Sequence, residues 1–315
     1  MTLSPAIRLW LSERFGPAAR FGEPLARHTS LGVGGPAEAW VAVPDEAGLS
    51  ELVGRAAHGA AILRVLGRGT NLLAPDEELS GIAATLGKGF TAIGVEREEG
   101  GRILVRAGAG ASLTALCRFA AAQGIAGMNF AVGIPGSVGG AVWGNAGTHA
   151  GCVADRLESL TLLRPDEAAR VIRREELSFG YRSLARDPAL FGAPGSPAVI
   201  TSALFALFRG RRDEIEAEAR EMLARRKATQ PQGVKSAGCF FRNPPGQSAG
   251  ALIDRAGLKN FRIGGALVSP VHANFLVNAG NAAAGDFLRL MEHVKTTVAD
   301  KFGVILTPEV TILVR

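Results

Sequence analysis

The chain has 315 residues, which is too long for one ordinary hydrophobic core, so we expect two or three domains. Hydrophobic residues make up 47% and charged residues 20%, as in globular proteins, and every apolar stretch ends well short of the ~20 residues of a membrane-spanning helix. The net charge of +6 allows either nucleic-acid binding or a site for an anionic small molecule. Because the basic residues are scattered and do not interleave with aromatic ones, we expect the small-molecule site and no nucleic-acid partner.

The cysteine content predicts a reducing compartment. The three cysteines, Cys117, Cys152 and Cys239, are an odd number without close pairs, which argues against a disulfide framework and against a zinc site. Residues 1–8 lack the basic and then apolar pattern of a signal peptide. We therefore expect a cytoplasmic protein that binds neither a metal nor a membrane.

The first predicted region covers about residues 1–86 and consists of short strands with a helix. Residues 37–43 alternate in polarity and predict a strand, and Asp45 caps a helix that reaches His58. The short apolar run 61–66 predicts a buried strand, which ends directly in the first of two glycine-rich loops.

The second predicted region covers about residues 87–207. Strands are expected at 102–107, 157–163 and 199–207. Ser112 caps a helix with one apolar face, on which Cys117 is predicted to be a core residue without a chemical role.

The third predicted region, 208–315, begins with a charged helix at 211–227. A loop at 229–245 contains Cys239, a helix follows at about 285–302, and a last strand at 309–314 closes the chain. The buried stripe of the first helix is predicted to hold Ile215, Ala219, Met222 and Leu223, and that of the second Phe287, Met291, Val294, Val298 and Phe302. Because strands and helices mix without strict alternation, the fold class is predicted to be α+β.

Two glycine-rich loops are candidates for ligand binding. The first, Gly67-Arg68-Gly69-Thr70-Asn71, has consecutive backbone N–H groups that can form a concave anion site, but it matches no phosphate-binding motif, so a plain turn remains open. The second runs from Gly133 to Gly147 and is long, low in charge and poor in large side chains. Such a segment suits backbone packed along a flat, extended ligand, and a tight turn between two strands is the alternative.

Five motifs in chain order resemble those of the UDP-N-acetylenolpyruvoylglucosamine reductase family. They are GRGTN, GIPGSVGGAVWGNAG, FGYR, SAGCFFRNP and the terminal TPEV. The resemblance extends from about Thr29 to the end of the chain. It implies an FAD-binding fold of the vanillyl-alcohol-oxidase type over 1–207, with subdomains at about 1–86 and 87–207. A smaller α/β substrate-binding domain would follow over 208–315, with Glu309 on its last strand at 304–315.

The resemblance also assigns residues. Arg182, Cys239 and Glu309 match the catalytic positions of the family. The implied contacts with non-covalent FAD are Gly67, Arg68, Gly69, Thr70, Asn71, Leu72, Gly133, Ile134, Pro135, Gly136, Ser137, Gly139, Gly140, Ala141, Asn145 and Gly147. The polar residues expected to bind the UDP-sugar are Tyr181, Lys235, Arg242, Asn243, Lys259, His272 and Asn274. The lysines and the arginine among them would meet the diphosphate of the UDP-sugar or the cofactor phosphate. His272 between Val271 and Ala273 is equally compatible with a packed histidine.

The chain departs from the common family pattern at two positions. Cys239 stands where the commoner motif has serine, and both residues carry a proton on a short side chain. Leu267 stands where many relatives carry glutamine, so we expect one contact with the substrate or the flavin to be missing. The short segment between Arg182 and Val199 resembles the compact branch of the family, which lacks an additional tyrosine-bearing loop over the substrate.

The implied reaction is the NADPH-dependent reduction of an enolpyruvyl group on a UDP-sugar, a step of peptidoglycan precursor synthesis. Arg182 is suited to the carboxylate and the growing enolate, because guanidinium is always charged and forks onto two oxygens. Cys239 is suited to proton donation, because a thiol has a reference pKa of about 8.5 and is neutral near pH 7. Glu309 is expected to polarise the enol or to assist proton delivery.

Two other functions remain open at this stage. The same fold serves oxidases of sugars or alcohols, which have no clear use for Cys239 and Glu309. A binding module for a nucleotide-sugar or a flavin would need no catalytic residues at all. We expect a monomeric enzyme.

Overall fold

The computed structural model describes residues 2–192 and 197–314. By its internal contacts the chain divides into two compact units. The first unit contains 1–21, 38–68 and 80–224, and the second contains 22–37, 69–79 and 225–315. These units are defined by packing, whereas the predicted domains are defined by the ligands they bind. The domain boundary predicted between residues 207 and 208 therefore stays a prediction.

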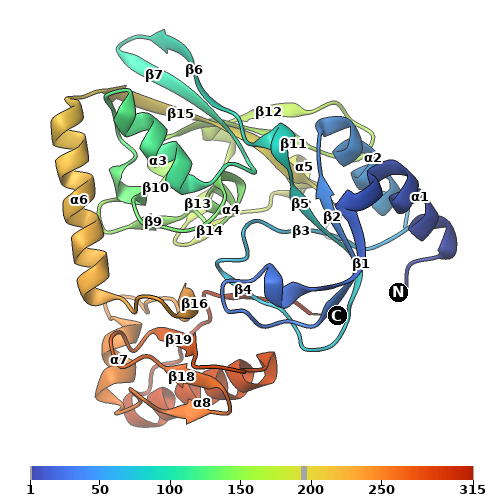
Figure 1. Cartoon of the computed structure of the whole chain (residues 1–315). Coiled ribbons are helices and arrows are strands. Elements are labelled where there is room, and N and C mark those ends of the chain that lie inside the picture. The colour runs from blue at the N-terminus through green and yellow to red at the C-terminus, as the bar shows by residue number, and fades with distance from the viewer. Residues whose placement is uncertain (1, 193–196, 315) are drawn as a thin grey trace. The chain divides into compact units, whose positions relative to one another are not determined.

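The larger sheet of the first unit is antiparallel, with strand order β12-β11-β15-β7-β6 and β8 paired to β15 (Figure 1). Alternate residues of its strands, such as Val105, Ala107, Ala203 and Phe205, enter one core together with apolar residues of helices α3 and α4. The bounds are β6 Ile93–Glu99, β7 Arg102–Gly108, β8 Ile125–Ala126, β11 Leu157–Leu163, β12 Arg170–Arg173, β15 Val199–Arg209, α3 Leu113–Ala122 and α4 Val138–Trp143.

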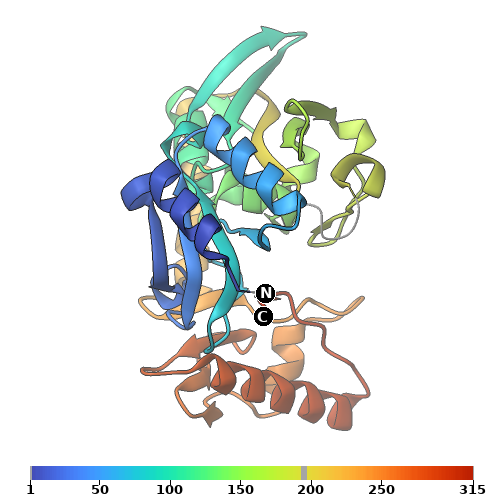
Figure 2. The same cartoon turned by 90° about the vertical axis from the view of Figure 1, so that its right-hand side faces the viewer.

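A smaller sheet lies mainly in the first unit and has the order β1-β2-β5-β3. Helices α1 and α2 lie side by side against it (Figure 2), and the Arg55 guanidinium lies 4.2 Å from the centroid of the Trp10 ring between them. The bounds are β1 Ala19–Pro24, β2 Pro36–Val43, β3 Leu63–Val65, β5 Leu79–Leu86, α1 Pro5–Phe15 and α2 Glu46–Ala57.

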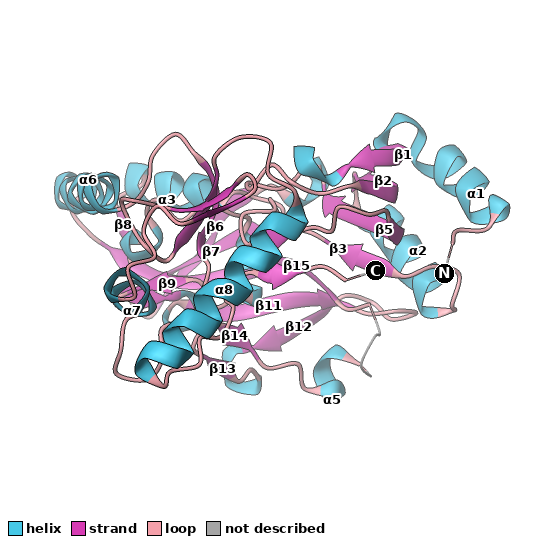
Figure 3. Ribbon diagram, turned by 90° about the horizontal axis from the view of Figure 1, so that it is seen from below, coloured by secondary structure: helices cyan, strands magenta, loops and turns pink. Residues whose placement is uncertain are grey.

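The second unit contains a four-stranded antiparallel sheet, β16-β19-β18-β17, and a parallel pair, β4-β20. Figure 3 shows α8 along its whole length. This helix buries Phe287, Leu290 and Val294 in a core that includes Phe240 and Phe241. The bounds are β4 Leu72–Leu73, β16 Lys235–Cys239, β17 Arg262–Ile263, β18 Ala266–Val268, β19 Phe275–Asn278, β20 Thr311–Ile312, α7 Ala249–Arg255 and α8 Ala284–Phe302.

Local signals predicted several elements correctly. Asp45 and Ser112 cap α2 and α3, as expected, and each side chain accepts a backbone N–H of the first turn. Along α8, Phe287, Met291, Val294 and Val298 are buried as predicted, with Phe302 half-buried.

Other expectations are wrong. Only Ile215 of the predicted stripe is buried in α6 (Arg212–Thr229), because helical spacing marks an apolar side without saying what packs against it. The run 61–66 yields only the three-residue, half-buried β3. The expected loop 229–245 contains β16, and the second glycine loop contains α4. Helices α1 and α7 were not predicted from the sequence.

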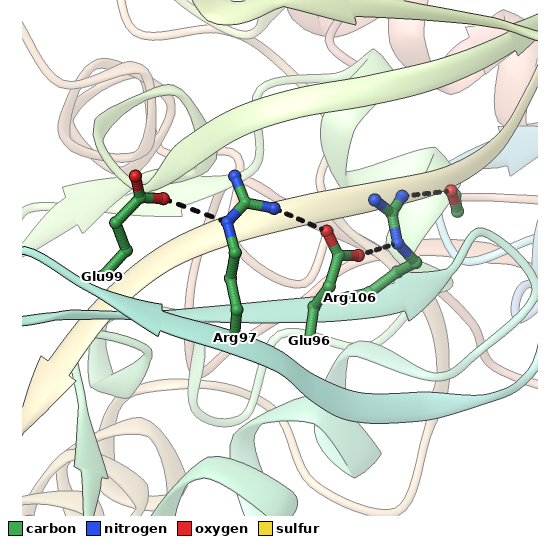
Figure 4. A network of polar contacts seen from close by, with 5 residues as sticks. Glu96, Arg97, Glu99 and Arg106 are labelled. Atoms are coloured by element: carbon green, nitrogen blue, oxygen red, sulfur yellow. Dashed lines mark hydrogen bonds and ion pairs between the residues drawn. The ribbon is translucent and has the colours of Figure 1, made fainter.

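The exposed edge strand β6 carries a chain of ion pairs (Figure 4). Arg97 donates to Glu99 and Glu96, each at 3.0 Å, and Glu96 also accepts from Arg106 of β7. The hydrogen bond from Arg106 lowers the pKa of Glu96. Charged side chains of this kind oppose the pairing of an edge strand with a second chain.

A buried carboxylate ties the N-terminal segment to the smaller sheet. Glu38 on β2 is 1% exposed. One of its oxygens accepts from Leu3 N–H at 2.7 Å and from the Arg8 guanidinium at 2.9 Å, and the other accepts from Gly81 N–H at 2.9 Å. Burial alone raises the pKa of this carboxyl, but the three donors outweigh burial and the net pKa lies below its ordinary value.

We expect Glu38→Gln to lower the free energy of unfolding by roughly 3 kcal/mol, because a neutral amide cannot serve all three donors. Because the pKa of Glu38 is lower in the folded protein than in the unfolded chain, its ionised carboxylate stabilises the fold at pH values above about 4.5. This contribution, which Glu38→Gln lacks, is lost as the pH falls below that value. Urea unfolding at pH 7 and pH 3.5 measures both effects. The exposed pair formed by Arg14 and Glu51 is the control, and Glu51→Gln should cost under about 1 kcal/mol. Equal losses for both variants would contradict the prediction.

Candidate active site

The two glycine loops lie against each other in the first unit. A Cβ added to Gly67 would meet the hydroxyl oxygen of Ser137 at 2.7 Å. Ser137 is the N-cap of α4, and its hydroxyl accepts the N–H of Gly140 at 3.2 Å. Gly67 therefore permits a contact between these loops that a side chain would prevent.

The second loop has the conformation that its glycines predict. Gly133 and Gly136 have φ values of 77° and 140°, in the region that favours glycine. Residues 133–147 contain no charged side chain, and the backbone at Gly133 and Gly140 is exposed. An uncharged, backbone-lined surface of this kind can approach the diphosphate and the flat rings of a dinucleotide without repelling them.

Arg182 lies at the tip of a hairpin formed by β13 (Phe179–Gly180) and β14 (Ser183–Leu184). Its φ is 56°, a left-handed conformation that is strained for a residue with a side chain. The Asn145 side chain holds this hairpin by donating to the carbonyl of Gly180 at 3.0 Å and accepting the N–H of Ala154 at 3.0 Å. The second glycine loop thus supports the residue that the sequence predicts as catalytic.

The rest of the first glycine loop belongs to the second unit. Gly69, with a φ of 63°, packs so closely on the backbone of His28 that a Cβ would meet its carbonyl oxygen at 1.9 Å. Asn71 donates from its side chain to the carbonyl of Glu309 at 3.1 Å, and its own carbonyl accepts the N–H of Thr311 at 3.1 Å. Asn71, predicted as an FAD contact, therefore also fixes the backbone that carries Glu309.

Cys239 ends strand β16 instead of lying in a loop, which corrects the sequence-based expectation. It pairs with Phe275 after an irregularity that begins at Ser236, and Gly238 has a φ of 77°. A β-bulge of this kind turns a side chain out of the regular alternation and is common beside active sites. The role of Gly238 was not predicted, although a glycine directly before a predicted catalytic residue was an available signal.

Two predicted catalytic residues come together in the second unit. The N–H of Glu309 donates to the carbonyl of Phe240 at 2.9 Å, and the N–H of Arg242 donates to the carbonyl of Thr307 at 2.9 Å. Phe241 and Pro308 form an antiparallel bridge between the same segments. Cys239 and Glu309 therefore lie on adjacent, hydrogen-bonded stretches of chain although 70 positions separate them in the sequence.

The remaining predicted contacts differ in exposure. Tyr181, Lys235 and Asn243 are exposed, whereas Arg242, Lys259 and His272 are half-buried. Lys259 forms an ion pair of 2.7 Å with Asp254. Burial lowers the pKa of His272, whose Nδ1 accepts the N–H of Asn274 at 3.2 Å, so a neutral ring carries its proton on Nε2.

Known proteins resemble this chain in both sequence and fold. A protein of Desulfosudis oleivorans named UDP-N-acetylenolpyruvoylglucosamine reductase is 48% identical over 314 residues, which are 99% of either chain. The chain belongs to the UDP-N-acetylenolpyruvoylglucosamine reductase family. A Pelobacter propionicus protein of the same name is 43% identical over 92% of this chain and 94% of its own. The crystal structure of this reductase from Thermus caldophilus has a TM-score of 0.77 and 37% identity, covering 92% of this chain and 97% of that one.

Family models divide the reductase into two parts. Residues 37–172 match an FAD binding domain, and residues 230–313 match the C-terminal domain of UDP-N-acetylenolpyruvoylglucosamine reductase. These matches confirm the predicted α+β fold, in which an FAD-binding part precedes a smaller domain, and FAD as the cofactor. The glycine loops of the first unit fit this cofactor, because Gly67, Gly133 and Gly140 are exposed and residues 133–147 carry no charged side chain.

The described residues also bear on the expectations about a membrane, a metal and Cys117. Within 2–192 and 197–314, no helix is long and apolar enough to cross a membrane. Over the same ranges, no cluster of three or more His, Cys, Asp or Glu residues is arranged to hold a metal ion. Cys117 is buried as predicted, and burial raises the pKa of its thiol to about 12, so it is unreactive near neutral pH.

Proposed function

We propose that the protein reduces the enolpyruvyl group of UDP-N-acetylglucosamine enolpyruvate to give UDP-N-acetylmuramate, with FAD as cofactor and NADPH as hydride donor. The observation that carries the proposal is the hydrogen-bonded pairing of the Cys239 and Glu309 segments within a chain of this family. A proton donor and a carboxylate on paired segments suit a reductase that must protonate its substrate, whereas an oxidase has no clear use for them.

Hydride transfer from NADPH to the enolpyruvyl group is the chemistry that bound FAD supplies. Gly67, Arg68 and the backbone of residues 133–147 would hold this cofactor. The chain itself must bind the substrate carboxylate, stabilise the enolate and deliver a proton to the middle carbon of the enolpyruvyl group. We assign these roles to its three predicted catalytic residues.

Arg182 would bind the carboxylate, and its charge would stabilise the enolate as negative charge grows there. The hydrogen bond from Asn145 to Gly180 supports the hairpin that carries Arg182, which suits a group that must be in place before the reaction begins.

Cys239 would donate the proton from its thiol to the middle carbon. Glu309, on the paired segment, would polarise the enol or assist this proton delivery. The exposed Lys235 and the half-buried Arg242 would contribute positive charge towards the diphosphate of the UDP-sugar or the phosphate of NADPH. A cytoplasmic location and a monomeric state are further parts of the proposal, and the odd number of cysteines without close pairs supports the first of them.

Anaerobic absorbance spectroscopy tests the proposal directly. We expect the flavin bands of the purified protein to bleach with NADPH and to return when the enolpyruvyl UDP-sugar is added. Return only with oxygen would indicate the oxidase, and flavin that never bleaches would indicate a binding module. Comparison of NADPH with NADH under the same conditions measures the preferred hydride donor.

A further inference from the structure

The two residues that follow Cys239 are held by a single buried asparagine. Phe240 and Phe241 are 0% and 1% exposed, so their backbone polar groups require partners inside the protein. Asn274, directly before β19, is 2% exposed. Its side-chain oxygen accepts the N–H of Phe241 at 3.0 Å, and its side-chain nitrogen donates to the carbonyl of Phe241 at 2.8 Å.

The backbone of Asn274 completes this attachment. Its carbonyl accepts the N–H of Phe240 at 2.7 Å. The fourth polar group of the two phenylalanines, the carbonyl of Phe240, accepts the N–H of Glu309 at 2.9 Å. Asn274 therefore binds three of the four backbone groups after Cys239, and the Glu309 segment binds the last one.

We infer that Asn274 is a positioning residue that sets the distance and orientation between the Cys239 thiol and the Glu309 carboxylate, an inference that rests on the proposed function. The bulge at Gly238 interrupts regular pairing just before Cys239, so the strand ladder alone does not orient the thiol. In place of regular strand hydrogen bonds, the side-chain carboxamide of Asn274 makes two hydrogen bonds with the backbone of Phe241. Its own polar groups are engaged with Phe241, so its effect on the reaction passes through the chain and not through direct contact with the substrate.

A selective effect on proton delivery distinguishes positioning from general support of the fold. Rings of Phe240 and Phe287 stack with their centroids 6.2 Å apart, so apolar packing retains this segment in the core without the asparagine side chain. We therefore expect Asn274→Ala to keep its FAD content and its rate of flavin reduction by NADPH. The rate of flavin reoxidation by the enolpyruvyl UDP-sugar should fall about 100-fold, as expected for a reacting group displaced by about 1 Å.

Asn278 offers a matched control at the other end of β19. Its side chain also holds backbone, donating to the carbonyl of Leu31 at 2.9 Å and accepting the N–H of Gly280 at 3.0 Å. Asn278→Ala should lose a comparable amount of stability and keep both half-reactions. If it slows reoxidation as much as Asn274→Ala does, the effect is general destabilisation and the inference fails.

A second variant decides the question if Asn274→Ala does not fold. Asn274→Asp has the same shape and still accepts the N–H of Phe241, but its ionised carboxylate cannot donate to the carbonyl of Phe241. We expect slowed reoxidation and normal reduction by NADPH, while hydrogen exchange at the amide of Phe241 stays as slow as in the wild type, because this amide keeps its acceptor and the segment stays folded. The exchange experiment requires no turnover.

Stopped-flow absorbance of wild type and variants under anaerobic conditions separates the two possible failures. If wild-type flavin is not reoxidised by the enolpyruvyl UDP-sugar, the proposed function is wrong. If the wild type is reoxidised and both Asn274 variants match its rate, the function stands and the positioning role of Asn274 is refuted.

Discussion

Cys239→Ala is expected to leave flavin reduction by NADPH at the wild-type rate and to slow reoxidation by the enolpyruvyl UDP-sugar by about 10²–10⁴-fold, the usual contribution of a general acid. The substitution removes only the thiol. The backbone on either side is held by the pairing with Phe275 and by the contacts of Phe240, so the geometry of the segment should survive. Stopped-flow absorbance at the flavin bands measures the two half-reactions separately.

A serine at this position provides the decisive comparison. Because the commoner family motif carries serine, Cys239→Ser should retain a clearly faster reoxidation than Cys239→Ala. Cys152→Ala, at the half-buried cysteine of β10 (Gly151–Cys152), is the control for loss of a thiol and should change neither half-reaction. Serine and alanine variants that are equally inactive, or equally active, would contradict proton donation from position 239.

Arg182→Gly is expected to slow flavin reoxidation by the substrate by about 10²–10³-fold while leaving the protein folded, since one donor to a developing oxyanion is typically worth 2.7–4 kcal/mol. Arginine adopts a left-handed backbone here, with a φ of 56°, at a cost of about 1–2 kcal/mol that glycine avoids. In the wild type the Arg182 guanidinium lies 5.4 Å from the centroid of the Tyr181 ring, and the loss of this contact offsets part of the stability gained from relieved strain. Unfolding in urea should therefore show a stability within about 1 kcal/mol of the wild type.

The control for this backbone effect is Asp166, which is also left-handed with a φ of 58°. Asp166→Gly should relieve less strain, because aspartate adopts the left-handed region more readily than arginine, and it should leave both half-reactions unchanged. Arg182→Lys keeps the charge but loses the two-point contact with a carboxylate, so its reoxidation rate should lie between those of wild type and Arg182→Gly. A fully active Arg182→Gly enzyme would exclude Arg182 from the reaction.

Elements governed by neighbouring residues were predictable from the sequence. Asp45 and Ser112 cap helices because their side chains reach backbone N–H groups within the same turn. The apolar repeat of α8 predicted its buried face because every residue of that stripe meets the same core. The motifs likewise predicted the family and FAD, since both depend on residue types in order along the chain.

Elements governed by distant residues were not predictable in this way. Strand β16 forms inside an apparent loop because β19, some 40 positions later, supplies its hydrogen-bonding partners. The prediction of a buried stripe on α6 is wrong because distant segments do not cover that face, and only Ile215 is buried.

The same distinction applies to the residues of the site. The sequence by itself determined which chemical groups are present: a guanidinium at Arg182, a thiol at Cys239 and a carboxylate at Glu309. Only the tertiary structure decided that Asn71 and Asn274 serve the backbone around Glu309 and Cys239. A carboxamide looks the same in a sequence whether it faces a ligand or a peptide, because its partner is chosen by segments that meet only after the chain has folded.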